Sequence, residues 1–138
     1  TGVQTCALPI LQGELAAADT QRLAAMTASV EALAATLKAD ALALEQAGAA
    51  LVVMEMVPSQ LAADITSSLN TMATIGIGAG VDCHGQVLVL HDLIGVFPGK
   101  RPRFAKNFME GASSIDEAVT RYVTDVRESR FPGPEHSY

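Results

Sequence analysis

Three polar features follow short apolar segments and could take part in chemistry. Glu55 ends the segment Ala50–Glu55, the glycine run Gly76–Gly80 ends a second segment, and His91–Asp92 ends a third. In a parallel α/β sheet or barrel, active sites gather at the carboxyl ends of the strands. If the three segments are parallel strands, the sequence predicts one common site at that edge.

Glu55 is the most informative of these residues, because it places a carboxylate inside the apolar segment Val52–Val57. An unpaired carboxylate is costly to bury, and a buried carboxylate can act as a general base near neutral pH. The alternative is a structural carboxylate that caps a helix or pairs with an arginine. Position alone leaves both interpretations open.

The glycine run lacks the spacing of a dinucleotide-binding loop. In the pattern G-x-G-x-x-G, the third glycine would fall at Val81 or at Cys83. Glycine here either lets a backbone approach a ligand or a neighbouring helix, or serves packing alone.

Four further side chains could be metal ligands, but no pair of them has zinc-finger spacing. They are Cys83, His84, His91 and Asp92. The sequence favours turn residues and a strand end at these positions, and it suggests no Ser/His/Asp constellation.

A local basic cluster stands out in an acidic chain. It consists of Lys100, Arg101, Arg103 and Lys106. Such a cluster could meet an anionic substrate, although a solvated face is the interpretation that we favour.

Apolar residues spaced by three or four predict a long helix that precedes the first strand. Gly48 suits the position that ends this helix, and Ser29 could cap a second helix within it. The apolar face contains Leu23, Met26, Val30, Leu33, Leu37, Ala41 and Leu44.

Three short apolar segments predict strands, and the first reads as a strand buried on both faces. They are Ala50–Glu55, Ala73–Gly78 and, after the turn Asp82–Gly85, Gln86–Leu90. Alternation with helices favours parallel βα units. The link between the second and third strands is too short for a full crossover helix.

The remaining helices are predicted from proline and capping signals. Pro58 opens one helix, to about Asn70, with Leu61, Ile65 and Leu69 on one face. Pro102 opens a short helix that carries Phe104 and Phe108. Ser114–Glu117 is a capping box, and its helix presents Ile115, Val119, Tyr122 and Val126. Pro98 and Gly99 mark a loop, and Phe131–Pro134 ends regular structure before an extended tail.

Composition excludes several classes of protein. The 138 residues are 49% hydrophobic and 17% charged, which fits one folded domain and argues against disorder. The longest apolar run, Ala47–Met54, is far shorter than the roughly 18–20 residues of a membrane span. A net charge of −6 and 4% aromatic residues argue against nucleic-acid binding. Two cysteines indicate a reducing compartment, so we expect a cytoplasmic location.

The first ten residues, 1–10, are expected to be foreign to the natural protein. They contain no charge, show no period, and resemble the translation of a sequencing adapter. Excluding them leaves Cys83 as the natural cysteine and residues 11–138 as the part to which the fold prediction applies.

Six segments together resemble ketopantoate hydroxymethyltransferases, in the order and with the spacing of that family. They are Ala41–Ala49, Val52–Pro58, Thr74–Gly80, Asp82–Asp92, Arg103–Phe108 and Pro132–Ser137. The resemblance covers about residues 30–138. It implies an α/β fold in which residues 11–138 are the C-terminal half of a (β/α)8 TIM barrel, with parallel strands and flanking helices.

The resemblance also implies a reaction. Enzymes of this family need a divalent metal, usually Mg2+, and transfer a one-carbon unit from 5,10-methylenetetrahydrofolate to 3-methyl-2-oxobutanoate. The product, 2-dehydropantoate, leads to pantothenate. A metal chelated by the keto acid stabilises the enolate, and Glu55 matches the family's proton acceptor. The resemblance further implies small-molecule partners and a homo-oligomeric parent enzyme.

The chain departs from the family in two places. The family's magnesium ligands lie in its first half, on an Asp-Ser pair, a second Asp, and a Lys with a nearby Glu, so no metal ligand or folate contact is assigned here. Leu11–Ser29 does not match the family's glycine-rich segment. We therefore expect the chain to be an inactive fragment of the enzyme. The alternatives are a metal-dependent keto-acid lyase of the phosphoenolpyruvate/pyruvate type and a non-enzymatic truncated fragment.

Overall fold

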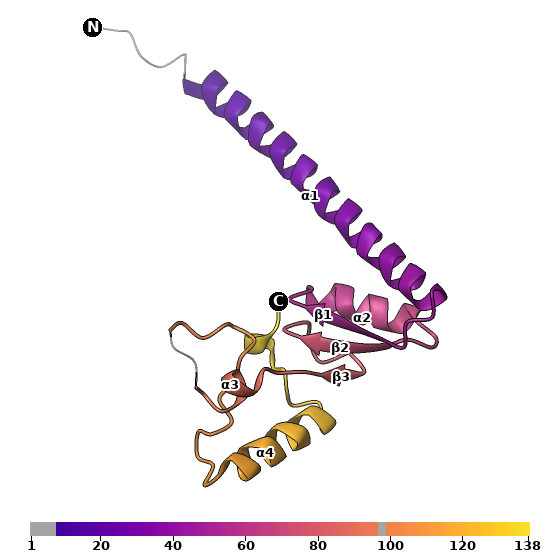
Figure 1. The fold of residues 1–138 in the computed structure, drawn as a ribbon. Helices are drawn as coiled ribbons and strands as arrows, with labels where there is room; N and C mark the ends of the chain where they lie inside the picture. Colours follow the sequence, from indigo (N-terminus) through magenta and orange to yellow (C-terminus); the bar gives the residue numbers. More distant parts are fainter. Residues whose placement is uncertain (1–7, 97–98) are drawn as a thin grey trace, which may run out of the picture. The chain divides into compact units, whose positions relative to one another are not determined.

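The computed structural model describes residues 8–96 and 99–138, with side chains from residue 16 onward. The chain divides after Ala39 into two units. The described part of the first unit belongs to helix α1, Leu8–Gln46, whose last residues lie in the second unit (Figure 1). The predicted helix is confirmed, and it begins earlier than its apolar spacing indicates.

Two local predictions about α1 have opposite outcomes. The expected second helix capped by Ser29 is wrong, because the Ser29 Oγ donates to the Ala25 carbonyl 2.9 Å away and the helix continues. The expected C-terminal glycine is confirmed. Gly48 has φ +89°, its N–H donates to the Glu45 carbonyl, and the Ala49 N–H donates to the Leu44 carbonyl. This pair of bonds is a Schellman motif.

Glu45, near the end of α1, joins this helix to the start of the second strand. Its Oε1 accepts hydrogen bonds from the backbone N–H groups of Asn70 at 2.8 Å, Thr71 at 2.6 Å and Met72 at 2.9 Å. Hydrogen bonds from the Thr71 and Met72 backbone lower the pKa of Glu45 to about 2. The carboxylate therefore fixes the loop that enters the strand.

A parallel sheet forms the centre of the second unit. Strands β1 (Leu51–Glu55), β2 (Ala73–Ile77) and β3 (Gly85–Gln86) lie in the order β1-β2-β3, and both pairings are parallel. Helix α2 (Ser59–Ser68) connects β1 to β2 and buries Ala62 and Ile65. The predicted parallel βα arrangement is confirmed.

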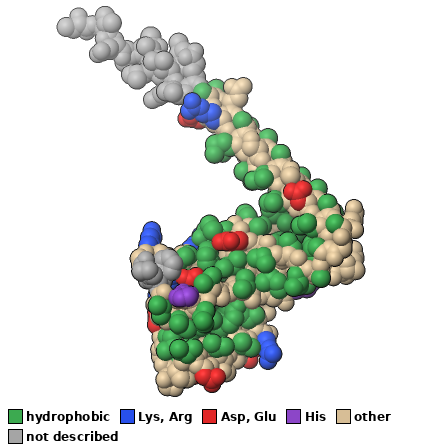
Figure 2. All heavy atoms as spheres, viewed as in Figure 1, with side chains coloured by type: hydrophobic (Ala, Val, Ile, Leu, Met, Phe, Trp, Pro, Cys, Tyr) green, Lys and Arg blue, Asp and Glu red, His purple; other side chains and the backbone are tan. Residues whose placement is uncertain are grey.

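The strands differ in burial from the prediction. β2 is buried or half-buried along its length, but Leu51 and Val53 of β1 are 62% and 60% exposed. The expectation that β1 is buried on both faces is therefore wrong for this chain, because β1 lies at the edge of the sheet and pairs with β2 alone. Hydrophobic side chains spread over the visible face of the second unit (Figure 2).

The predicted third strand, Gln86–Leu90, is mostly wrong. After the bond from Val87 N–H to the Gly76 carbonyl the ladder stops, and Leu90–Leu93 forms the short helix α3. The N–H groups of Asp92 and Leu93 both donate to the Val89 carbonyl. The helical turn thus supplies hydrogen-bond partners for these backbone groups. In an extended third strand the same groups would need a further neighbouring strand as their partner.

Aromatic residues from three segments build the core of the second unit. Phe108, Tyr122 and Phe131 contact one another edge to face, with ring centroids 5.4–5.8 Å apart. Phe104 and Phe108 are both buried. The helix predicted from Pro102 is wrong, because residues 103–104 and 108–111 form turns and the backbone between them is irregular. Pro98 of the predicted loop lies outside the described residues, whereas Gly99 lies in a bend, as expected for a loop.

Helix α4, Ile115–Arg127, begins at the predicted cap. The Ser114 Oγ accepts the Glu117 N–H at 3.1 Å, while the Glu117 carboxylate accepts the Ser113 N–H at 2.7 Å. The predicted apolar face is only half correct. Tyr122 and Val126 pack on the core, but Ile115 is 55% exposed and the neighbouring Ala118 is fully buried.

Within residues 8–96 and 99–138, no helix has the length and apolar character that crossing a membrane requires. The expectation that residues 1–10 are foreign stays a prediction. Residues 1–7 lie outside the described part, and residues 8–10 belong to α1.

The Glu45 contact yields a pH-dependent prediction. We expect Glu45→Gln to lower the urea midpoint of unfolding at pH 7, measured by circular dichroism. The substitution removes the negative charge of the carboxylate that accepts hydrogen bonds from three backbone N–H groups. The folded pKa is about 2 against an ordinary 4.5. The carboxylate's contribution is therefore complete above pH 4.5 and declines as the pH falls toward 2.

The matched control is Glu31→Gln on the exposed surface of α1. The difference between Glu45→Gln and the wild type should shrink across that pH interval, and the control should match the wild type throughout. Equal midpoints for Glu45→Gln and the wild type at pH 7 would contradict the role of Glu45.

The α4 cap yields a second prediction. Ser114→Ala removes the acceptor for the Glu117 N–H and should lower the free energy of unfolding by about 1 kcal/mol, measured by urea titration. Ser29→Ala, which removes a hydroxyl from the middle of α1, serves as the control and should change it little. An equal decrease in the free energy of unfolding in both variants would show that the Ser114 cap does not stabilise the fold more than an ordinary helix hydroxyl does.

Candidate functional site

The carboxyl ends of β1 and β2 lie side by side, as the sequence predicts. Glu55 pairs with Ile77, and the Met56 N–H donates to the Ile77 carbonyl at 2.9 Å. Glu55 is thus next to the point where the glycine run leaves β2. His91–Asp92 is different, because α3 replaces the strand end that the sequence predicts there.

Glu55 is exposed at this edge, so burial supplies no argument for a general base in this chain. The residue after it, Met56, has φ +54° and turns the chain toward α2. Among the residues that the structure describes, no hydrogen bond or ion pair joins the Glu55 carboxylate to another side chain. Its catalytic role therefore stays a prediction.

The glycine run packs against protein atoms. A Cβ on Gly76 would lie 2.9 Å from the Cys83 Sγ, and one on Gly80 would lie 2.7 Å from the Ser59 Cβ at the start of α2. A Cβ on Gly78 would lie 3.2 Å from the Tyr138 ring. Of the alternatives that the sequence left open, close approach to a neighbouring helix and packing describe these glycines.

The C-terminal segment reaches the same edge, which the sequence did not predict. Residues Pro134–His136 form the short 3-10 helix η1, so the tail is not simply extended. The Tyr138 carbonyl accepts hydrogen bonds from the Ser59 N–H at 2.7 Å and the Ser59 Oγ at 2.8 Å. Figure 1 shows the C-terminus beside the end of β1.

Arg103 of the basic cluster holds this tail. Its guanidinium donates to the carbonyls of Pro134 and Glu135, each at 3.2 Å, and lies 5.4 Å from the centre of the Tyr138 ring. The expectation of a merely solvated basic face is therefore wrong for Arg103.

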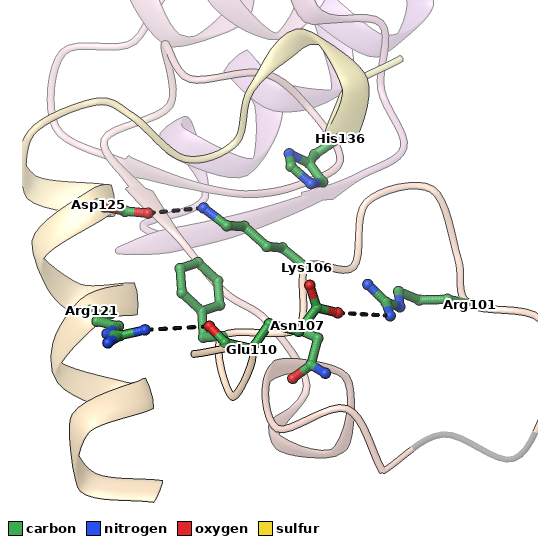
Figure 3. Close-up of a pocket in the computed structure, with 8 residues that line it drawn as sticks. Arg101, Lys106, Asn107, Glu110, Arg121, Asp125 and His136 are labelled. Carbon is green, nitrogen blue, oxygen red and sulfur yellow. Dashed lines mark hydrogen bonds and ion pairs between the residues drawn. The ribbon is translucent and has the colours of Figure 1, made fainter. Parts of the chain in front are cut away.

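Two other residues of the basic cluster line a hollow of about 420 Å3 (Figure 3). Arg101 lies 3.5 Å from the Glu110 carboxylate, and Lys106 donates to Asp125 at 3.0 Å. Burial raises the pKa of Asp125, but hydrogen bonds from Lys106 and Arg130 outweigh it and hold the pKa below its ordinary value. These cations are thus engaged by acids of the same chain.

The four candidate metal ligands do not converge. His84 Nδ1 lies 3.1 Å from the Thr74 N–H, and burial raises the pKa of the half-buried Cys83. His91 is exposed, whereas Asp92 is buried in α3. No group of three histidine, cysteine or acidic side chains within the described ranges could hold a metal ion.

Comparison with known proteins identifies the family. Residues 17–134 match the family model for ketopantoate hydroxymethyltransferase. A 3-methyl-2-oxobutanoate hydroxymethyltransferase of Azoarcus sp. (strain BH72) is 73% identical over 105 residues, which are 76% of this chain and 39% of the relative. The enzyme of Aromatoleum aromaticum is 68% identical over 108 residues, or 78% of this chain and 40% of the relative.

The chain spans about 40% of the length of the curated relatives it matches. Five of the six segments that carry the resemblance lie within the matched region, which ends inside the sixth, Pro132–Ser137. Glu55 and Gly78, which lie at the carboxyl ends of β1 and β2, are both inside it. The chain belongs to the ketopantoate hydroxymethyltransferase family.

Proposed function

We propose that this chain is the C-terminal half of an enzyme that makes 2-dehydropantoate for pantothenate biosynthesis. The enzyme would transfer a hydroxymethyl group to 3-methyl-2-oxobutanoate, with 5,10-methylenetetrahydrofolate and water supplying that group. The observation that carries the proposal is the 73% identity to a relative named as such a transferase. The parent enzyme would be a cytoplasmic homo-oligomer whose partners are the keto acid and the folate.

The observed sheet supports a (β/α)8 barrel as the fold of the whole enzyme. Three parallel strands and the connecting helix α2 are units of such a barrel. In a closed barrel, β1 would gain a second neighbour and its exposed Leu51 and Val53 would become covered. The share of the relatives that this chain matches leaves room for the other strands.

Glu55 is the residue to which we assign proton removal. The carbon next to a keto group is acidic enough for a carboxylate to deprotonate it when the carboxylate is held within hydrogen-bond reach. Glu55 ends β1 at the carboxyl edge and its carboxylate is accessible to a ligand. Glu55 would take the proton from C3 of the keto acid, and the resulting enolate carbon would form the new bond to the one-carbon unit.

Mg2+ belongs to the proposal through the family resemblance, and the described residues do not by themselves fit it. They contain no group of three candidate ligands. We therefore assign no metal ligand to this chain and route no step through the metal.

A chimera tests the proposed function. Residues 30–138 of this chain would replace the matching segment of the Azoarcus enzyme, and product formation would be followed with Mg2+, the keto acid and the folate. We expect the chimera to form 2-dehydropantoate and the purified 138-residue chain to form none. Turnover by the chain alone would contradict its assignment as an inactive fragment, and an inactive, folded chimera would contradict the proposed function.

Glu55 is tested in the same chimera. Glu55→Gln should lower kcat by roughly 10²–10⁴, because a general base is lost. The Mg2+ concentration that gives half-maximal activity should not change. Asp82→Asn, which removes an exposed carboxylate from the link after β2, is the control and should retain full kcat. A Glu55→Gln variant with unchanged kcat would remove Glu55 from the mechanism.

A further inference from the structure

The loop after β1 carries a polar residue at each end. Glu55 ends the strand, residues 56–58 form the turn, and Ser59 begins α2. No side chain caps α2 at its N-terminus, since its N-cap residue is Pro58. The first N–H groups of a helix need acceptors from elsewhere.

The acceptor for Ser59 comes from the far end of the chain. The Tyr138 carbonyl receives both the Ser59 N–H at 2.7 Å and the Ser59 hydroxyl at 2.8 Å. Two donors on one residue thus fix the tail to the same loop that holds Glu55.

Two glycines make this docking possible. Gly78 follows the β2 residue that pairs with Glu55, and a Cβ there would lie 3.0 Å from the Phe104 Cβ and 3.2 Å from the Tyr138 ring. Gly80 has φ +82°, and a Cβ there would meet the Ser59 Cβ at 2.7 Å. The ring of Tyr138 therefore lies directly over the carboxyl end of β2.

Tyr138 and Arg103 offer a defined chemistry at this edge. The Tyr138 side chain remains 38% exposed, and the exposed Arg103 lies over its ring. Two N–H groups of the Arg103 guanidinium donate to tail carbonyls. The guanidinium carries five N–H groups in total, so further donors remain for a ligand. An aromatic surface beside a positive charge suits an aromatic anion.

We propose that the segment Pro134–Tyr138 is a wall of the substrate site, that Tyr138 and Arg103 bind the folate one-carbon donor there, and that Ser59 is a positioning residue for this wall. The inference rests on the proposed function, because folate is an aromatic anion with a glutamate carboxylate. The keto acid is also an anion but lacks an aromatic part, so the Tyr138 ring favours the folate over the keto acid at this wall.

The decisive measurement is the separation of two KM values in the chimera. Ser59→Ala should raise KM for 5,10-methylenetetrahydrofolate about fivefold, the ratio expected for one lost hydrogen bond. KM for the keto acid and kcat should stay within about twofold, since both depend on other groups. Ser59→Thr retains the hydroxyl and should restore KM for the folate.

Ser67→Ala is the matched control. It removes a hydroxyl from the last turn of the same helix, where the Ser67 Oγ donates to the Asp64 carbonyl at 3.0 Å, away from the tail. It should leave both KM values unchanged. Tyr138→Ala retains the backbone carbonyl but removes the aromatic ring from the wall, and it should raise KM for the folate at least as much as Ser59→Ala.

Hydrogen exchange of the complete 138-residue chain gives a second readout that does not depend on activity. The amide N–H of residue 59 should be protected from exchange in the wild type. It should exchange faster in Ser59→Ala and at the wild-type rate in Ser67→Ala. Unprotected Ser59 in the wild type would overturn the docking of the tail.

The kinetic outcomes separate the two proposals. An active wild-type chimera in which Ser59→Ala and Tyr138→Ala leave KM for the folate unchanged would overturn the wall and leave the proposed function standing. An inactive wild-type chimera would overturn the proposed function and the wall with it. Equal rises in both KM values, with kcat lowered as well, would reduce Ser59 to a structural cap and overturn its assigned role.

Discussion

The parallel pairing of β1 with β2 is the constraint on which the candidate site depends. It requires that both strands start at the same end of the sheet, and Glu45 secures this by binding three successive N–H groups just before β2. The Schellman turn at Gly48 then directs the chain from α1 into β1. Because the two strands start together and have equal lengths in register, Glu55 and Ile77 end together.

Local signals in the sequence predicted much of this arrangement. Gly48, the segment Ala50–Glu55 and the Ser114 cap each depend on residues within a few positions of one another, and each is confirmed. The edge location of Glu55 follows from the strand order that these signals imply. The family was likewise readable from short motifs distributed over residues 30–138.

The features that sequence reasoning missed depend on contacts between distant residues. The β-branched Val87 and Val89 favour a strand, but a strand there needs a partner on its far side, and a helical turn begins at Leu90 instead. The docking of Tyr138 on Ser59 joins residues 79 positions apart, and a carbonyl acceptor leaves no signature in the type of residue. The sequence shows the glycines as a run, but the need for glycine comes from side chains that pack against them. These side chains belong to three other segments and are Ser59, Phe104 and Tyr138.

The contact between the tail and Ser59 uses the backbone carbonyl of Tyr138 and not the side chain of that residue. Any amino acid at position 138 supplies the same carbonyl, so the anchor tolerates substitution while the side chain that faces the sheet edge changes. The backbone at position 138 therefore binds the tail to Ser59, while the side chain at the same position determines the chemistry of the surface, and the two can change independently. Evolution could alter the surface offered beside Glu55 one residue at a time without loosening the segment that carries it.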